Sequence, residues 1–154
     1  MNTRLEKFLI VSQHLVSFDP FLLLGTGVAV DYLRTLDQSV PKGISEAFVN
    51  TADQFSGCSD AEAVATSLLN DFTLGPVARN IIMLWYLGSW MALPAEWHAA
   101  YGTSETERTG VVSAAAYQAG LQWEIIGAHP PGSRQQGFAS WANAGSRAAV
   151  AGRS

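Results

Sequence analysis

The sequence predicts an all-α fold, a compact bundle of about five or six helices followed by an extended C-terminal tail. Two observations predict it. Apolar residues recur at three- and four-residue spacing through much of residues 1–126, which is the period of helices that bury one face. Residues 127–154 combine proline, glycine and aromatic residues without a helical or strand period. We therefore expect a single domain overall, with a helical part at 1–126 and an extended tail at 127–154.

The first helix is expected to end near Ser17, because Asp19 can cap a second helix that has Pro20 at its first position. The second helix is expected to reach about Leu36. Its buried face would carry Phe21, Leu24, Val28, Tyr32 and Leu33. A shorter helix is expected over Ser45 to Phe55, after Pro41 and Gly43.

Ser59 and Glu62 have the spacing of a capping box, which would open a further helix whose apolar face extends to Phe72. The next helix is expected from about Pro76 to Trp90. Periodicity is weak after Trp90, and the segment from Val111 to Gln122 is compatible with either a helix or a strand, with its alanines favouring the helix.

Charged residues make up only 14% of the chain, whereas about 25% is usual for a globular domain. The net charge is -4 and Lys7 and Lys42 are the only lysines, so nucleic-acid binding and a polybasic lipid-binding face are not expected. A surface so poor in charge favours a permanent partner that covers part of it.

No residue pattern predicts catalytic, cofactor-binding or metal-binding chemistry. Gly25 and Gly27 begin a dinucleotide-type glycine pattern, but Val30 stands where the third glycine belongs, so a local bend or close helix packing is expected. The single cysteine, Cys58, excludes an internal disulfide framework and a cysteine-based zinc site. Glu105 and Glu107 lie in a polar turn that is expected to be solvated.

His14, His98 and His129 are far apart in the sequence, so they predict no metal site. The most apolar segment, Ile81 to Leu93, is shorter than the ~20 residues of a membrane span. The N-terminal residues contain neither a twin arginine nor an uninterrupted apolar run of export-signal type.

Aromatic residues cluster between residues 85 and 101. Trp85, Tyr86, Trp90, Trp97 and Tyr101 all lie in this stretch. A helix that is apolar on every side must be covered on every side, so these side chains belong either to the core or to a partner interface. The tail raises the same question, because Phe138 and Trp141 are costly to leave in water. They either wrap a partner, which we favour, or pack back on their own domain.

Several segments, in this order, resemble the small subunit of the membrane-associated, FAD-containing sorbitol dehydrogenase family. They read FLIVSQHLVSF, IIMLWYLG, AAYQAGLQW and HPPG followed by GFASW. The matching positions are Phe8, Ser12, Leu15, Trp85, Tyr86, Gly88, Tyr117, Gly120, Leu121, Trp123, Pro130, Pro131, Gly132, Gly137, Phe138 and Trp141. The resemblance covers residues 5 to 142.

The resemblance implies a non-catalytic subunit that binds a larger catalytic subunit of the glucose-methanol-choline type. That partner would hold the FAD and oxidise a sugar or polyol, and a cytochrome c subunit would take the electrons onward. The small subunit would aid folding, stability or export of the large one. The resemblance points to a periplasmic or membrane-associated complex, and the lack of an export signal leaves a cytoplasmic location open.

The residues expected to face the partner are Trp85, Tyr86, Trp90, Trp97, Tyr117, Trp123, Pro130, Pro131, Phe138 and Trp141. Two other classes stay open at this point. One is a helical chaperone or membrane-surface protein that is not tied to a dehydrogenase, and the other is a free-standing enzyme.

Overall fold

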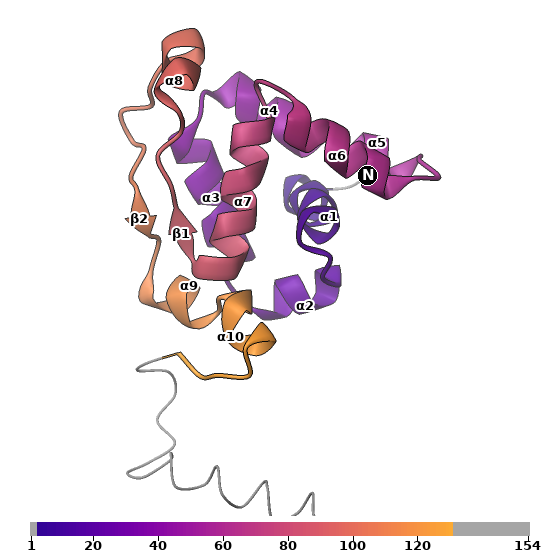
Figure 1. Cartoon of the computed structure of the whole chain (residues 1–154), viewed down its shortest axis with the longest axis vertical. Coiled ribbons are helices and arrows are strands. Elements are labelled where there is room, and N and C mark those ends of the chain that lie inside the picture. Colours follow the sequence, from indigo (N-terminus) through magenta and orange to yellow (C-terminus); the bar gives the residue numbers. More distant parts are fainter. Residues whose placement is uncertain (1–2, 131–154) are drawn as a thin grey trace, which may run out of the picture.

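The computed structural model describes residues 3–130, which form a compact and mostly helical body, as predicted (Figure 1). The elements are α1 (Arg4–Val16), α2 (Pro20–Gly25), α3 (Ala29–Ser39), α4 (Lys42–Asn50), α5 (Ala52–Ser56), α6 (Ala61–Asn70), α7 (Gly75–Leu87), β1 (Ser89–Trp90), α8 (Ala95–Tyr101), β2 (Gly110–Val111), α9 (Ala114–Gln118) and α10 (Leu121–Ile125). No helix within residues 3–130 is long and apolar enough to cross a membrane.

Helix α7 is the centre of the fold and packs against α1, α3, α6, α9, α10 and β1 (Figure 1). Its buried residues include Ile81, Leu84 and Trp85, which lie on one face at helical spacing. Tyr32 of α3 packs edge-on against Trp85, with the ring centroids 4.9 Å apart. Phe8 of α1 lies on the same indole at 6.3 Å, so three helices meet around Trp85.

The chain that follows α7 runs back along this helix. Strand β1 pairs antiparallel with β2, with Trp90 opposite Gly110. Asn80 of α7 fixes the segment, because its side-chain oxygen accepts from the Met91 N–H at 2.7 Å and its amide nitrogen donates to the Met91 carbonyl at 3.0 Å. Because both the oxygen and the nitrogen of this buried amide are hydrogen-bonded, Asn80 holds the backbone of Met91 against α7.

The predicted boundary between the first two helices is confirmed. Helix α1 ends at Val16, and Ser17 adopts a left-handed conformation with φ of 57°. The Asp19 carboxylate then accepts from the Phe21 N–H at 2.8 Å, and Pro20 occupies the first position of α2.

The predicted second helix is two helices, α2 and α3. The Thr26 hydroxyl donates to the Leu23 carbonyl at 2.6 Å, and Gly27 has φ of +76°, a conformation that few other residues adopt. The Gly25 to Gly27 segment is therefore a bend between helices, as expected. The bend turns α2 against α1 instead of continuing the buried face of α3.

Three further boundaries differ from prediction. The helix expected over 45–55 divides at Thr51, whose hydroxyl donates to the Phe48 carbonyl at 2.7 Å. Helix α6 is capped by Asp60 instead of Ser59 and ends at Asn70, before the exposed Phe72. The segment from 111 to 122 contains the end of β2 as well as α9 and the start of α10.

Helix α7 ends at Leu87, three residues before the predicted end at Trp90. Gly88 is the cause, because it adopts φ of +67° and its N–H donates to the Leu84 carbonyl at 2.8 Å. Gly88 also lets α9 approach closely. A Cβ at this position would lie 2.5 Å from backbone atoms of Ala116, and one at Gly120 would lie 2.7 Å from the Tyr86 carbonyl oxygen. Two glycines therefore hold α9 and the start of α10 against the end of α7.

Candidate functional site

Three of the tryptophans predicted to face a partner are buried in the core. Trp85, Trp90 and Trp97 are covered by elements of this chain, so the core alternative holds for them and the expected partner contact is wrong at these positions. The Trp97 indole N–H donates to the Thr73 carbonyl at 2.8 Å. Trp90 lies in β1 instead of on α7, which moves its ring away from the helix surface on which it was expected.

Glu107 is the partner of Trp90, and its predicted solvated position is wrong. Its carboxylate accepts from the Trp90 indole N–H at 3.1 Å and lies 3.3 Å from His98 Nε2, and only 8% of the side chain is exposed. The other ring nitrogen of His98 lies 3.2 Å from the Gly102 carbonyl. Both nitrogens are thus used in structural contacts that fix the turn between α8 and β2.

We expect Glu107→Ala to lower the free energy of unfolding by about 1–3 kcal/mol, because it leaves the buried Trp90 N–H without an acceptor. The matched control is Glu105→Ala in the same turn, which changes an exposed side chain and should cost less than about 0.5 kcal/mol. Urea unfolding followed by circular dichroism measures both variants. Equal effects would show that the Glu107 contacts contribute nothing to stability.

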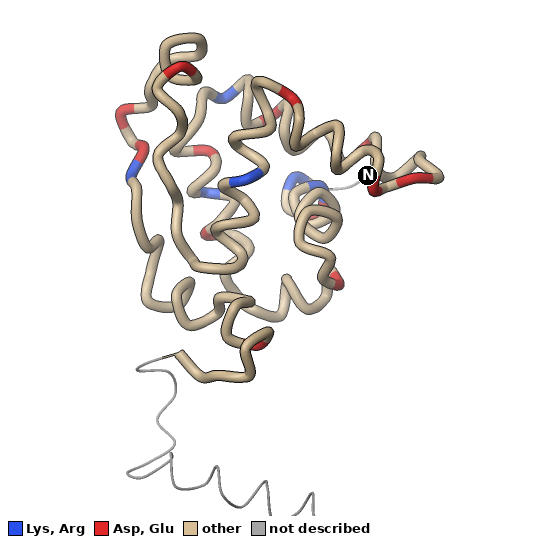
Figure 2. Tube along the Cα trace, viewed as in Figure 1, with Lys and Arg blue, Asp and Glu red and all other residues tan. Residues whose placement is uncertain are grey.

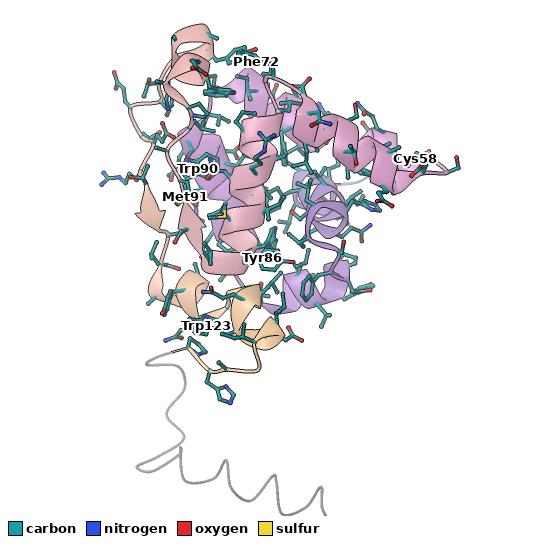
Figure 3. The ribbon with its side chains drawn as sticks, viewed as in Figure 1. Cys58, Phe72, Tyr86, Trp90, Met91 and Trp123 are labelled. Atoms are coloured by element: carbon teal, nitrogen blue, oxygen red, sulfur yellow. The ribbon has the colours of Figure 1, made fainter. Side chains whose placement is uncertain are left out.

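Tyr86, Tyr117 and Trp123, three of the other predicted interface residues, lie together at one end of the molecule (Figure 3). The Tyr86 hydroxyl donates to the Val16 carbonyl at 3.4 Å, and its ring packs edge-on against Phe18. The Trp123 indole N–H donates to the Tyr117 carbonyl at 2.9 Å, and the two rings meet edge-on at 5.5 Å. All three side chains are half-buried.

The same end exposes large apolar side chains of α2 and α10. The exposed fractions are 81% for Phe21, 57% for Leu22, 48% for Leu24, 60% for Ile125 and 65% for Ile126. Tyr86 contacts the chain before both helices: its ring packs against Phe18 before α2, and its backbone carbonyl oxygen lies close to Gly120 before α10. We call the surface formed by Phe21, Leu22, Leu24, Ile125 and Ile126 the α2–α10 end.

Sequence reasoning missed the α2 part of this surface, since Phe21 and Leu24 were expected on a buried face. A signal was present in the sequence. The segment PFLLLG is apolar on every side, and six residues cannot turn every side toward one core.

The α2–α10 end is poor in charge. No lysine or arginine occurs between Lys7 and Arg34, or between Arg108 and residue 130. Asp19 and Glu124 are the only charged residues of α2, α10 and their flanking turns, and the lower part of Figure 2 is correspondingly almost free of colour. Depletion of charge around exposed aromatic and aliphatic side chains is the composition found at the centre of protein interfaces.

A groove between α1 and α2 borders this surface. Its volume is about 370 Å³, and it is lined by Glu6, Leu9, Ile10, Pro20, Phe21 and Leu24. Apart from Glu6, every side chain that lines it is apolar. The groove suits an apolar side chain better than a polar ligand.

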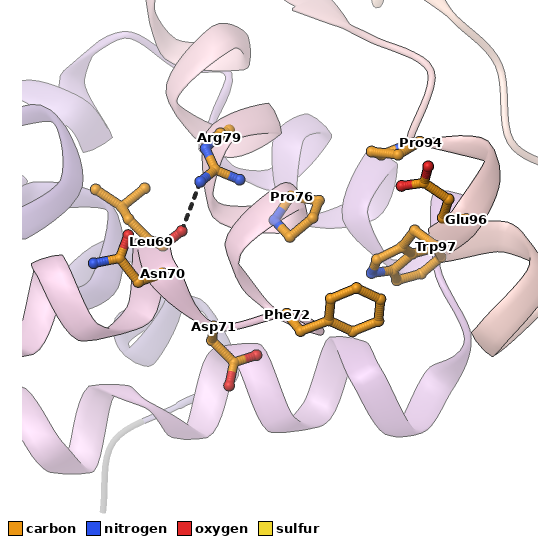
Figure 4. Close-up of a pocket in the computed structure, with 9 residues that line it drawn as sticks. All are labelled: Leu69, Asn70, Asp71, Phe72, Pro76, Arg79, Pro94, Glu96 and Trp97. Atoms are coloured by element: carbon orange, nitrogen blue, oxygen red, sulfur yellow. Dashed lines mark hydrogen bonds between the residues drawn. The ribbon is translucent and has the colours of Figure 1, made fainter.

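A second pocket lies on the other side of the fold, where α6, α7 and α8 meet (Figure 4). Phe72, Pro76 and Trp97 form its floor, and the Arg79 guanidinium at one edge donates to the Leu69 carbonyl at 2.8 Å. Glu96 stands at the opposite edge. Asp71, the third charged residue of the lining, accepts from the N–H groups of Thr73 and Leu74 at 2.8 and 2.6 Å.

The titratable residues of the described chain are dispersed. Within residues 3–130, no three His, Cys, Asp or Glu side chains come close enough to share a metal ion. The His14 ring stacks on Phe55 with centroids 4.5 Å apart, and burial lowers its pKa below 6.5. Burial and the nearby Asp31 raise the pKa of the Tyr32 hydroxyl. Cys58 lies at the turn before α6 and its thiol contacts the Phe55 carbonyl (Figure 3).

The C-terminal part of the predicted interface lies at and beyond the edge of the described residues. Pro130 is buried at the end of the described chain. Pro131, Phe138 and Trp141, and with them most of the predicted partner-wrapping tail at 127–154, lie outside the described residues.

Comparison of the chain with protein-family models, with curated proteins and with solved structures gives no match.

Proposed function

We propose that this chain is a non-catalytic small subunit that binds and stabilises a larger catalytic protein. The α2–α10 end carries the proposal, because it presents five exposed apolar side chains without a neighbouring lysine or arginine. Leaving such a surface in water is unfavourable by roughly 25 cal/mol for each Å² of apolar area. A partner that covers it gains that free energy, and tyrosines and tryptophans such as Tyr86, Tyr117 and Trp123 at the same end of the molecule are typical anchors of an interface.

A protein partner suits this surface better than a membrane does. Helices that lie on a lipid surface combine an apolar face with lysines and arginines that contact anionic headgroups. The α2–α10 end has the apolar face but only acidic charges, Asp19 and Glu124. The alternative of a membrane-surface protein therefore has less support than a subunit interface.

Because the chain resembles the small subunit of the sorbitol dehydrogenase family, we propose that the partner is an FAD-dependent sugar or polyol dehydrogenase of the glucose-methanol-choline type. Residues that carry the resemblance lie at the same end of the molecule. Tyr86, Tyr117 and Trp123 are half-buried there, while Gly88 and Gly120 hold α9 and α10 in place. In the proposed complex the FAD belongs to the partner, a cytochrome c subunit accepts the electrons, and this chain assists the folding, export or maturation of the flavoprotein.

The proposal predicts the outcome of co-expression with a flavoprotein of this type encoded beside the chain. The two proteins should co-purify, and the soluble yield of flavoprotein should rise several-fold over expression without this chain, because an exposed interface on either protein favours aggregation. Flavin absorbance should appear with the complex and not with this chain alone. A flavoprotein that is equally soluble and active without this chain, together with a monodisperse monomer of this chain by light scattering, would refute the proposal.

A further inference from the structure

The groove between α1 and α2 has the shape of a receptor for one large side chain. Leu9 and Ile10 of α1 face Phe21 and Leu24 of α2 across it, and Pro20 completes the apolar wall. A closed cavity of about 150 Å³ is enough to hold a benzene ring. A groove of about 370 Å³ that is open on one side therefore accommodates a Phe, Leu or Trp side chain together with part of the backbone that carries it.

The one charged residue that lines the groove is acidic, and the cations of α1, Arg4 and Lys7, pair with Asp37 and Asp53. Glu6 lines it, Asp19 precedes its proline wall, and Glu124 is on α10 at the same end of the molecule. Within residues 3–130 none of these three carboxylates forms an ion pair, although those of Asp31, Asp37 and Asp53 do. An apolar groove with the unpaired carboxylates of Glu6 and Asp19 at its walls attracts a segment that carries positive charge and repels an acidic one.

We propose that the groove binds a partner segment in which a large apolar side chain is accompanied, within about one helical turn, by a lysine or arginine. The inference rests on the proposed function and specifies the chemistry of the surface that the catalytic subunit presents. The apolar side chain enters between Ile10 and Phe21, and the cation lies near Glu6. One oxygen of the Glu6 carboxylate accepts from the Thr3 N–H at 2.5 Å, which leaves the other oxygen for the partner.

Two synthetic helical peptides of equal length test the inference. Both carry the same Leu and Phe face, one is flanked by lysines and the other by glutamates, and each is titrated into the full-length chain by calorimetry at low salt. We expect the lysine peptide to bind at least fivefold more tightly, and expect added salt to reduce the difference. Glu6→Gln keeps the side-chain acceptor for Thr3 but removes the charge, so it should also reduce the difference.

Leu24→Gln should weaken the lysine peptide about tenfold, because it places an amide in the apolar wall of the groove. Val30→Gln is the matched control, since Val30 on α3 is similarly exposed but does not line the groove, and binding should be unchanged. Equal affinity for the two peptides, no binding of either, or equal loss in the two variants would overturn the inference. These outcomes test only the groove. The proposed function is tested separately, by co-purification with the flavoprotein.

Discussion

We expect Gly88→Ala to lower the free energy of unfolding by about 2–5 kcal/mol, the largest effect among the glycines of residues 3–130 because it alone combines a positive φ with close backbone contacts. Two costs combine. An alanine held at φ of +67° costs about 1–2 kcal/mol, because its Cβ crowds the adjacent carbonyl. The new methyl group would also lie 2.5 Å from the Ala116 carbonyl, so α9 must move. Overpacking of this kind costs about 1–3 kcal/mol.

Gly27→Ala separates the two costs. Gly27 has a similar φ of +76°, but nothing lies within 4 Å of an added Cβ, so the expected loss is only about 1–2 kcal/mol. Urea unfolding of the two variants at low protein concentration, followed by circular dichroism, gives the comparison. If both lose the same amount, α9 does not pack on Gly88 as the structure places it. If Gly88→Ala loses more, α9 and α10 depend on this contact for their position at the candidate interface.

The sequence predicted the helical fold well where the signal was local. The boundary at Asp19 and Pro20 was predicted correctly because a cap and a first-turn proline act within a few residues. The sequence did not predict the breaks between helices at positions where the apolar period continues across the break. Nothing in the spacing around Thr51 shows that its hydroxyl bonds to Phe48 and divides the helix, since apolar residues continue on the same face.

Contacts between residues that are far apart in the sequence were the other feature that could not be predicted. The polar neighbours of Glu107 predict a solvated turn residue, yet its side chain is buried against Trp90, 17 positions earlier. That contact exists because β1 and β2 pair, and two-residue strands leave almost no alternating pattern in a sequence. The tryptophans show the same limit. The sequence indicates that Trp85, Trp90 and Trp97 must be covered, but it does not decide between this chain and a partner, and the structure shows that this chain covers them.

The candidate interface was predicted in part. Tyr86, Tyr117 and Trp123 were named from the sequence, and the structure brings them together, although contact of these residues with a partner stays a prediction. The apolar period of the residues that follow Phe21 predicts that Phe21 faces the core. The bend at Gly27 removes it from that period, and its ring is therefore among the most exposed apolar groups of the described chain.

We expect Phe21→Ser to weaken binding of the proposed catalytic partner about 30-fold to 1000-fold, the largest effect on the proposed function of any substitution in α2. Phe21 is 81% exposed in the subunit alone, so nearly the whole ring is available for burial in a complex. Removing an aromatic anchor from the centre of an interface costs about 2–4 kcal/mol, which corresponds to that range of affinity. The fold should be unaffected, because the ring contributes little to the core.

Phe72→Ser is the control that makes this result specific. Phe72 is 65% exposed and lies at the opposite end of the molecule, so its removal changes the apolar surface by a comparable amount outside the proposed interface (Figure 3). Surface plasmon resonance with the immobilised flavoprotein measures both affinities, and circular dichroism verifies that both variants are folded. Phe72→Ser should bind like the unmodified chain. If instead Phe72→Ser loses binding and Phe21→Ser retains it, the partner covers the α6–α8 side of the fold and the α2–α10 end is not its interface.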